Sequence, residues 1–213
     1  MTATPLPIAV LASGGGTNLQ ALLDTVHGHE AEVVALASDN PEAPALERAA
    51  ARGVATRVFE RSAYSARQER DTAMGDWLEE RGARLVVLAG YMALLSPAFL
   101  ERFPGAVINV HPSLLPAFPG LHAIEQALDY GVKLFGVTVH FVDEGCDSGP
   151  VIFQRSLELP DARDPEDVLR ALRPLEHTLL PEAVRLFARG ALRPDPSNPR
   201  RIEIDVSTHR SPA

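Results

Sequence analysis

Short apolar runs rich in β-branched residues alternate along this chain with longer segments that repeat apolar residues at helical spacing. Such alternation is typical of βαβ units, in which a helix connects two neighbouring parallel strands. Several runs are apolar at every position, as expected for strands that are covered by helices on both faces. The sequence therefore predicts an α/β fold, with a mostly parallel twisted sheet between two layers of helices.

Turn and breaker residues between these runs set the expected element bounds. Strands are expected at Ile8–Ala12, Glu32–Ser38, Thr56–Phe59, Leu85–Ala89, Ala106–Val110, Val137–Val142 and Val151–Glu158. Helices are expected at Asn18–Val26, Ala43–Arg52, Ala66–Arg81, Pro97–Glu101, Ala123–Tyr130 and Pro165–Arg189. Ser96 and Asp164 each precede a proline at a first helical position, which predicts that both side chains cap a helix.

The length of 213 residues fits one ordinary domain with a small appendage. From Arg193 onward prolines and charged residues increase, and only Arg201–Val206 alternates in the manner of one strand. We therefore predict a globular domain over residues 1–192 and a C-terminal tail over residues 193–213, partly extended or disordered.

Charge and cysteine content restrict the partners and the compartment. A net charge of −8 predicts repulsion from nucleic acids and from anionic membrane surfaces. The single cysteine, Cys146, excludes an internal disulfide and favours a reducing compartment. The first residues lack the pattern of a signal peptide, and the uncharged run Leu85–Leu100 is shorter than the ~20 apolar residues that span a bilayer. We expect a cytoplasmic protein with no membrane partner.

A glycine loop, Ser13–Asn18, follows the first expected strand and leads into a helix. Glycines let a ligand approach the backbone, and the N-terminus of a helix favours an anion such as a phosphate. The loop lacks the lysine of a Walker A motif, and Leu19 stands where a dinucleotide fingerprint requires glycine. A nucleoside triphosphate or a dinucleotide is thus disfavoured, and a tight turn without a ligand is an alternative.

Asn109 and His111 lie two residues apart at the end of an expected strand, so their side chains project from one face. An amide donor, an imidazole and a carboxylate such as Asp147 together suit acyl transfer through a tetrahedral intermediate. The sequence has no Gly-x-Ser-x-Gly elbow, so the nucleophile should come from the substrate. The alternatives are a hydrogen-bonded strand end for Asn109 and His111 and an ordinary turn for Asp147.

His122 and His140 are expected to support the site or the fold, and Cys146 is expected to be a bystander. No spacing of His, Cys, Asp or Glu residues predicts a metal site.

Four motifs occur in order along the chain: Ser13–Gln20, Leu88–Met92, Asn109–His122 and Asp147–Ile152. With these motifs the chain resembles the phosphoribosylglycinamide formyltransferases, the folate-dependent glycinamide ribonucleotide transformylases of purine synthesis, from about Ile8 to Leu192. The resemblance implies a Rossmann-like formyltransferase fold and a formyltransferase catalytic domain over residues 1–192. It also implies that the amine of glycinamide ribonucleotide attacks the formyl carbon of 10-formyltetrahydrofolate, which is a co-substrate, without a metal.

The resemblance assigns a role to each matching residue. Asn109 would hold the formyl oxygen, protonated His111 would act as general acid, and Asp147 would sustain the charge of His111. The ribonucleotide side would comprise Gly16, Thr17, Asn18, Arg173 and Glu176. The folate side would comprise Arg67, Met92, Ala93, Leu94, Leu95, Asn109, Asp143, Glu144, Gly145, Cys146 and Asp147. Ala93 stands where some relatives carry arginine, and Arg173 where others carry glutamine or lysine. The family pattern also suggests a cis peptide bond between Leu115 and Pro116.

Two related enzymes and one non-enzymatic function share parts of this pattern. A methionyl-tRNA formyltransferase would carry a further C-terminal domain and need a basic surface, whereas this chain is acidic. A formyltetrahydrofolate deformylase would carry an additional N-terminal domain, and it would leave the glycine loop without a phosphate partner. A protein that only senses a nucleotide would need no proton donor at His111. The oligomeric state does not follow from the sequence.

Overall fold

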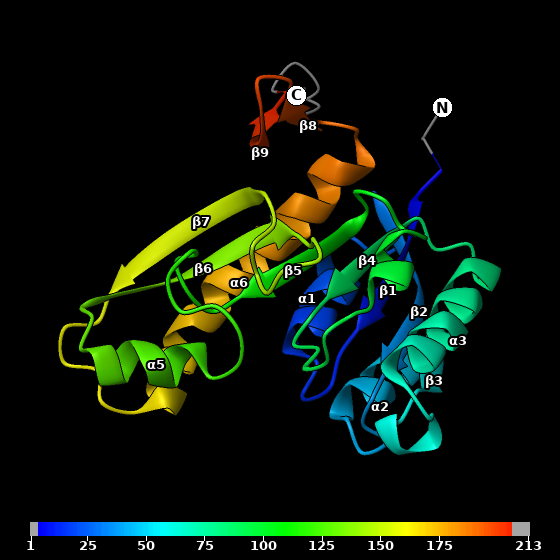
Figure 1. The fold of residues 1–213 in the computed structure, drawn as a ribbon, viewed down its shortest axis with the longest axis horizontal. Coiled ribbons are helices and arrows are strands. Elements are labelled where there is room, and N and C mark those ends of the chain that lie inside the picture. The colour runs from blue at the N-terminus through cyan, green and yellow to red at the C-terminus, as the bar shows by residue number, and fades with distance from the viewer. Residues whose placement is uncertain (1–3, 206–213) are drawn as a thin grey trace.

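Within the part of the chain that the structure describes, nine strands form one sheet in the order β3-β2-β1-β4-β5-β6-β7-β9-β8 (Figure 1). The structure is a computed structural model and describes residues 4–205. Strands β1 to β5 are parallel, whereas β6 pairs antiparallel with both β5 and β7. The strands are β1 (Leu6–Leu11), β2 (Ala31–Ser38), β3 (Ala55–Val58), β4 (Leu85–Leu88), β5 (Val107–His111), β6 (Leu134–Phe141), β7 (Val151–Glu158), β8 (Leu192–Asp195) and β9 (Asn198–Ile204).

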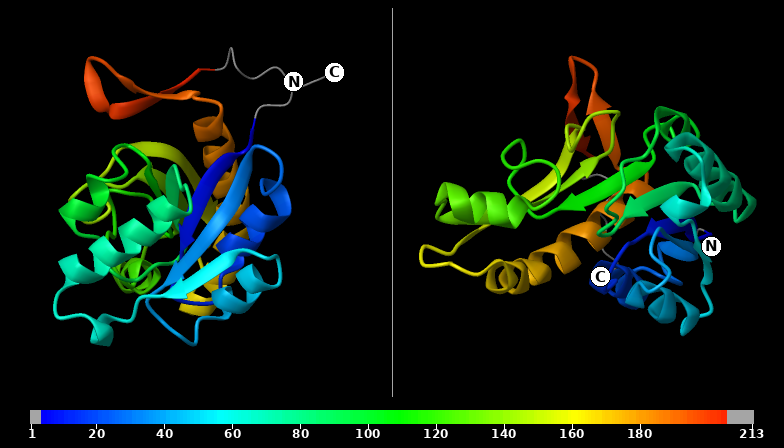
Figure 2. Two further views of the ribbon diagram at one scale, coloured as in Figure 1. Left: turned by 90° about the vertical axis from the view of Figure 1, so that its right-hand side faces the viewer. Right: turned by 60° about the horizontal axis from the view of Figure 1, so that its bottom comes forward.

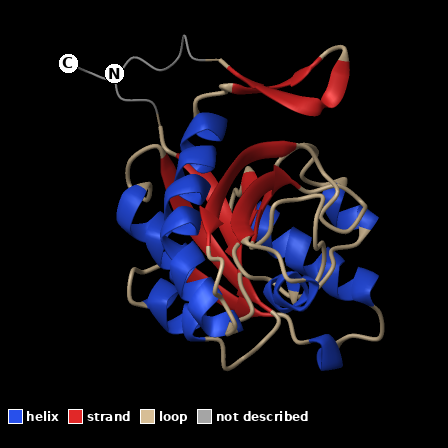
Figure 3. Cartoon of the chain, turned by 90° about the vertical axis from the view of Figure 1, so that its left-hand side faces the viewer, coloured by secondary structure: helices blue, strands red, loops and turns tan. Residues whose placement is uncertain are grey.

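Helices cover both faces of this sheet (Figures 2 and 3). One face packs against α1, α2, α5 and α6, and the other packs against α3 and α4. The helices are α1 (Thr17–Thr25), α2 (Pro44–Ala50), the 3₁₀ turn η1 (Arg61–Ala63), α3 (Arg67–Glu80), α4 (Pro97–Leu100), α5 (Ala123–Tyr130) and α6 (Pro165–Ala188). The predicted α/β class with a mostly parallel sheet is confirmed.

Strand β1 shows why its sequence is apolar at every position. Ile8 and Val10 belong to the core beneath α1 and α6, whereas Ala9 and Leu11 belong to the core beneath α3. All four side chains are completely buried. Because successive residues of a strand point to opposite faces, a strand between two helical layers needs apolar residues in both positions.

All seven strands and six helices predicted up to residue 189 are present, with ends that differ by no more than three residues. The 3₁₀ turn η1 was not predicted.

Of the two predicted helix caps, the one at Asp164 is confirmed. Asp164 caps α6, since its carboxylate accepts a hydrogen bond from the backbone N–H of Glu166. The predicted cap at Ser96 is wrong: its hydroxyl is buried and makes no hydrogen bond to any residue that the structure describes. Instead, the backbone N–H of Ser96 donates to Asp71 Oδ2 over 2.7 Å.

The C-terminal segment differs from the single strand expected there. It forms a hairpin of β8 and β9, because Asp195 Oδ1 accepts hydrogen bonds from the backbone N–H and the hydroxyl of Ser197 and so closes a turn. The hairpin joins the sheet where Val151 of β7 pairs with Arg201. The expected disorder at the end of the chain, and Val206 of the expected strand, lie outside the described residues.

The strand order reverses between β1 and β4, which lie side by side although β2 and β3 intervene in the sequence. In open α/β sheets the crevice beyond the carboxyl ends of the strands at such a point is the usual ligand site. The glycine loop after β1, the segment after β4 and the end of β5 all meet at this edge. The fold therefore gathers the motif-bearing segments on one side of the molecule.

Candidate active site

Asn109 and His111 occupy the carboxyl end of β5, and their side chains project from the same face as predicted. In the neighbouring strands, Asn109 is paired with Leu88 of β4 and with His140 of β6. The peptide bond between Leu115 and Pro116 in the following loop is cis, as the family pattern suggested. His111 is 5% exposed, so its imidazole faces a largely enclosed volume.

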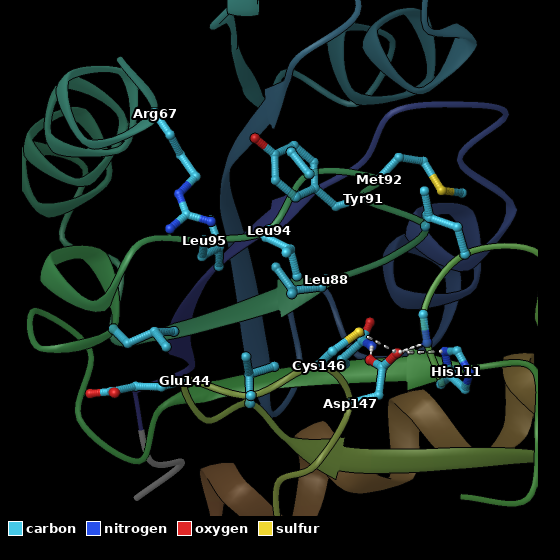
Figure 4. Close-up of a pocket in the computed structure, with 18 of the residues that line it drawn as sticks. Arg67, Leu88, Tyr91, Met92, Leu94, Leu95, His111, Glu144, Cys146 and Asp147 are labelled. Atoms are coloured by element: carbon cyan, nitrogen blue, oxygen red, sulfur yellow. Dashed lines mark hydrogen bonds and ion pairs between the residues drawn. The ribbon is translucent and has the colours of Figure 1, made fainter. Parts of the chain in front are cut away.

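Asp147 lies in the loop between β6 and β7, and its carboxylate meets both β5 side chains (Figure 4). Asn109 Nδ2 donates to Asp147 Oδ1 over 3.1 Å. Asp147 Oδ2 accepts from the backbone N–H of Gly120 over 2.8 Å and lies 3.4 Å from His111 Nδ1. The structure thus brings together the three residues that the sequence singled out for catalysis.

The backbone of this loop fixes where the carboxylate points. Asp147 has a φ of 50°, a left-handed conformation that aspartate and asparagine tolerate better than most residues. A Cβ atom on Gly149 would come within 1.8 Å of the carbonyl oxygen of Phe141, so only glycine fits there. Asp143 Oδ1 also accepts hydrogen bonds from Gly145 N–H and the Ser148 hydroxyl. The loop is therefore held by its own contacts before any ligand arrives.

Asp147 is ionised at neutral pH in this environment. Burial alone would raise its pKa, but the hydrogen bond with His140, the positive charge of His111 and the Gly120 N–H together lower the pKa to about 2. His111 Nε2 lies 2.9 Å from the carbonyl oxygen of Phe118, which can only accept. Because Asp147 is also an acceptor, the ring donates at both nitrogens only as the imidazolium.

His140 joins the site more closely than the sequence indicated. It is 1% exposed, and its Nε2 lies 3.5 Å from Asp147 Oδ1 and 3.2 Å from Asn109 Nδ2. Its Nδ1 lies 2.8 Å from the carbonyl oxygen of Phe141. The strand register could have shown its place, since His140 is the residue of β6 paired with Asn109.

A cavity of about 850 Å³ opens beside these side chains. All the residues expected on the folate side line it: Arg67, Met92, Ala93, Leu94, Leu95, Asn109, Asp143, Glu144, Gly145, Cys146 and Asp147. In Figure 4, Met92, Tyr91 and Arg67 lie across the pocket from His111 and Asp147. Met92, Leu94 and Leu121 are each more than half exposed and give the pocket apolar walls. Sequence reasoning assigned no role in the pocket to Tyr64, Arg70 and Leu121, which also line it.

The residues expected on the ribonucleotide side do not line this cavity. Instead, α1 begins directly after Gly16, whose φ is 69°. Asn18, in the first turn of α1, donates from Nδ2 to Glu176 Oε2 of α6 over 2.9 Å. Burial raises the pKa of Glu176, although the Asn18 hydrogen bond and the charge of Arg173 oppose this. Asn18 thus meets Glu176 across the α1–α6 contact, and Gly16 and Thr17 directly precede Asn18 in the chain.

Tyr91, in the pocket wall, has a buried hydroxyl with no hydrogen-bond partner among residues 4–205. Burial also raises the pKa of this phenol. A buried polar group without a partner costs about 1 kcal/mol or more. We expect Tyr91→Phe to leave the thermal midpoint unchanged or to raise it by about 2 to 4 °C, with Tyr130→Phe, whose residue is 80% exposed, as the control. A clear fall in the midpoint of Tyr91→Phe alone would show that the hydroxyl is bonded in solution.

Across residues 4–205, no cluster of three or more His, Cys, Asp or Glu side chains is arranged to bind a metal ion. Within the same range no helix has both the length and the apolar composition needed to cross a membrane.

Comparison with known proteins places this geometry in a family. The formyl transferase family model matches residues 6–184. The phosphoribosylglycinamide formyltransferase of Haemophilus influenzae is 38% identical over 188 residues, which cover 87% of this chain and 89% of that protein. A trifunctional purine biosynthetic protein of Drosophila pseudoobscura is 40% identical over 190 residues, but this chain spans only 14% of its length.

Solved structures agree in fold. Glycinamide ribonucleotide transformylase 1 of Symbiobacterium toebii superposes with a TM-score of 0.88 at 43% identity, and the match covers 94% of each chain. The phosphoribosylglycinamide formyltransferase of Coxiella burnetii gives a TM-score of 0.86 at 34% identity, over 95% of this chain and 94% of that one. The likeness therefore extends over most of the chain.

Proposed function

This chain belongs to the formyl transferase family and, within it, to the phosphoribosylglycinamide formyltransferases, and we propose that it formylates glycinamide ribonucleotide in purine biosynthesis, with 10-formyltetrahydrofolate as the donor. The observation that carries the proposal is the convergence of Asn109, His111 and Asp147 beside one large cavity. The nucleophile is the substrate's amine, so the enzyme needs no nucleophile of its own. It needs hydrogen-bond donors for the formyl oxygen and a group that transfers protons.

The folate occupies the cavity in this proposal. Its apolar walls suit a flat pterin ring, and the backbone of the loop from Asp143 to Asp147 offers polar groups to the edge of that ring. Arg67, at the far side from Asp147, is placed to attract an anionic glutamate tail (Figure 4). Some relatives have a second arginine at the position of Ala93. Alanine carries no charge, so Ala93 cannot help Arg67 to attract the glutamate tail.

The ribonucleotide occupies the edge formed by the glycine loop and α6. The N-terminus of α1 supplies unpaired N–H groups and a partial positive charge for the phosphate. The Asn18 amide and the Glu176 carboxylate, held together at 2.9 Å, offer acceptors and donors to the neutral part of the substrate. Burial raises the pKa of Glu176, and the positive charge of Arg173, which opposes that rise, adds a cation at this edge.

The reaction forms one C–N bond and breaks another. The amine nitrogen attacks the formyl carbon, and the formyl oxygen becomes an oxyanion that the His111 imidazolium and the Asn109 amide stabilise. The bond from the formyl carbon to N10 of the folate then breaks, and the proton lost by the amine ends on N10. Asp147 holds the ring of His111 in place through the contact with Nδ1, and His111 acts as the general acid between these two transfers. The products are formylglycinamide ribonucleotide and tetrahydrofolate.

Asn109 must change partners for this chemistry. Its amide nitrogen faces Asp147 Oδ1 at 3.1 Å and His140 Nε2 at 3.2 Å. A formyl oxygen therefore competes with one of these contacts, and the contact with His140 is the longer of the two. Catalytic hydrogen bonds are often rearranged in this way between the free enzyme and its complex.

The test is the release of tetrahydrofolate from 10-formyltetrahydrofolate, followed spectroscopically with and without glycinamide ribonucleotide. Release that requires the ribonucleotide is the expected result. Release that does not require it would identify a deformylase instead, and no release at all would refute the proposed transfer. A formyl-accepting tRNA in place of the ribonucleotide is the control that tests for methionyl-tRNA formyltransferase activity.

We further propose a cytoplasmic location, which the single cysteine favours, and small molecules as the substrates. The net charge of −8 opposes a nucleic-acid partner. Both features agree with an enzyme that acts on small metabolites and binds their anionic groups at individual sites, such as the N-terminus of α1 and Arg67.

A further inference from the structure

Both backbone polar groups of Met92, in the folate-side wall, are held by side chains from elsewhere in the chain. The N–H of Met92 donates to the Ser13 hydroxyl oxygen over 2.9 Å. The carbonyl oxygen of Met92 accepts from Arg61 Nη2 over 3.2 Å. Since the Met92 side chain is 56% exposed, its own packing does little to fix its position. The backbone contacts therefore decide where this part of the wall stands.

Asp39, directly after β2, links the two groups that hold Met92. The Ser13 hydroxyl donates to Asp39 Oδ1 over 2.5 Å, and Asp39 Oδ2 lies 3.4 Å from Arg61 Nη2. The Asp39 side chain is 8% exposed, whereas Arg61 is 60% exposed. A closed ring of contacts thus runs from Met92 through Ser13, Asp39 and Arg61 back to Met92. The buried carboxylate is the fixed member of that ring.

Ser13 is also the first residue of the glycine loop, and its backbone is fixed on both sides. Its N–H donates to the carbonyl oxygen of Gly90 over 3.0 Å, and its own carbonyl oxygen accepts from Asn40 Nδ2 over 3.1 Å. The same residue therefore touches the segment after β2, the segment after β4 and the loop that leads to α1. Neither Ser13 nor Asp39 lines the cavity itself.

We propose that Asp39 is a positioning residue for the folate, acting through the Ser13 hydroxyl on the backbone of Met92. The inference rests on the proposed function, because it assigns the Met92 wall to the folate. The carboxylate orients the serine hydroxyl, whose single hydrogen is used on Asp39, so that the oxygen lone pairs face the Met92 N–H. Without that acceptor the hydroxyl turns, and the wall loses one anchor.

The experiment compares Ser13→Ala, Asp39→Ala, Asp39→Asn and the double variant Ser13→Ala/Asp39→Ala in formyl transfer and in tetrahydrofolate binding by calorimetry. Loss of one such hydrogen bond corresponds to about a fivefold change in affinity. We expect Ser13→Ala and Asp39→Ala each to raise the KM for 10-formyltetrahydrofolate and the Kd for tetrahydrofolate about five- to tenfold, with kcat within about twofold. The double variant should be no weaker than Asp39→Ala, because both changes break the same path.

Asp39→Asn removes the negative charge of the side chain but keeps an oxygen that can accept the Ser13 hydrogen bond. Its side-chain oxygen can still accept from Ser13, so folate affinity should return to within about twofold of the wild type. Arg61 is left intact, because it lines the cavity and could contact the folate directly. Asp24→Ala, which breaks the exposed Asp24–Arg52 ion pair away from the pocket, is the matched control and should change neither constant.

An unchanged Kd for tetrahydrofolate in Ser13→Ala, with a normal melting temperature, would overturn the inference. An equal rise in the constants for both substrates in every variant would overturn it as well, because that pattern indicates general loosening of the fold. The proposed function fails separately, through absence of ribonucleotide-dependent transfer by the wild type. If Asp39→Ala does not fold, Ser13→Ala and Asp39→Asn still decide the outcome.

Discussion

His111→Ala is expected to lower kcat by about 10²- to 10⁴-fold, the range that a positioned general acid contributes. The imidazole is 5% exposed, between the Asp147 carboxylate at 3.4 Å and the Phe118 carbonyl oxygen at 2.9 Å. Its removal takes away the donor that faces the developing oxyanion in the proposed mechanism. It also leaves Asp147 with one donor fewer. Binding of the folate should change much less, because the apolar walls of the cavity remain.

The measurement is steady-state transfer together with circular dichroism of the purified variant. His111→Gln is the informative companion, since its amide can still donate to Phe118 but carries no charge and no transferable proton. Its kcat should fall almost as far as that of the alanine variant. His29→Ala, at an exposed position, is the control. Transfer by His111→Ala at the wild-type rate would remove His111 from the proposed mechanism.

Asp147→Asn is expected to lower kcat by about 10²-fold or more, with the KM for the ribonucleotide within about threefold. The substitution is mild for the backbone, because asparagine tolerates the φ of 50° found at this position. It is severe for the chemistry, because the amide carries no charge to sustain the His111 imidazolium. One of the two oxygens that accept from Asn109 and Gly120 also becomes a donor group.

The same variant should change how stability depends on pH. The Asp147 pKa of about 2 in the folded protein lies below its ordinary value of 3.8, so the carboxylate stabilises the fold fully above pH 3.8. That contribution is lost as the pH falls from 3.8 through 2. Urea unfolding at several pH values should therefore show a difference between wild type and Asp147→Asn that shrinks in this window. A difference that persists unchanged at pH 2, or a variant impaired only in ribonucleotide binding, would contradict the assignment.

The pair Asn109 and His111 was accessible from the sequence, because a spacing of two in a strand means a shared face. Asp147 was accessible as a candidate by its chemistry and by the family motif. Its distance from the pair was not, because that depends on the register of β5 with β6 and on the bend at Gly149. The place of His140 depends on the same register. Local patterns therefore identify the residue types, and long-range strand pairing decides their separations.

The errors have the same origin. Ser96 precedes a proline at the start of a helix, as a capping residue does. Its N–H, however, donates a hydrogen bond to the buried carboxylate of Asp71, 25 residues earlier. The hairpin of β8 and β9 was missed because prolines usually interrupt strands, whereas Pro194 lies in β8, the strand at the edge of the sheet. The contact between Ser13 and Met92 joins residues 79 positions apart. None of these partners can be found by a local pattern.

The site combines parts of the chain that open on different timescales. β5 is flanked by β4 and β6, and its Ile108 is completely buried, so amide hydrogens there exchange with solvent only when most of the protein unfolds. Asp147 sits in a loop whose residues 144–146 are exposed, and such loops open locally. Mild denaturant should therefore detach the carboxylate while the sheet is intact. The enzyme would lose its activity before it loses its fold.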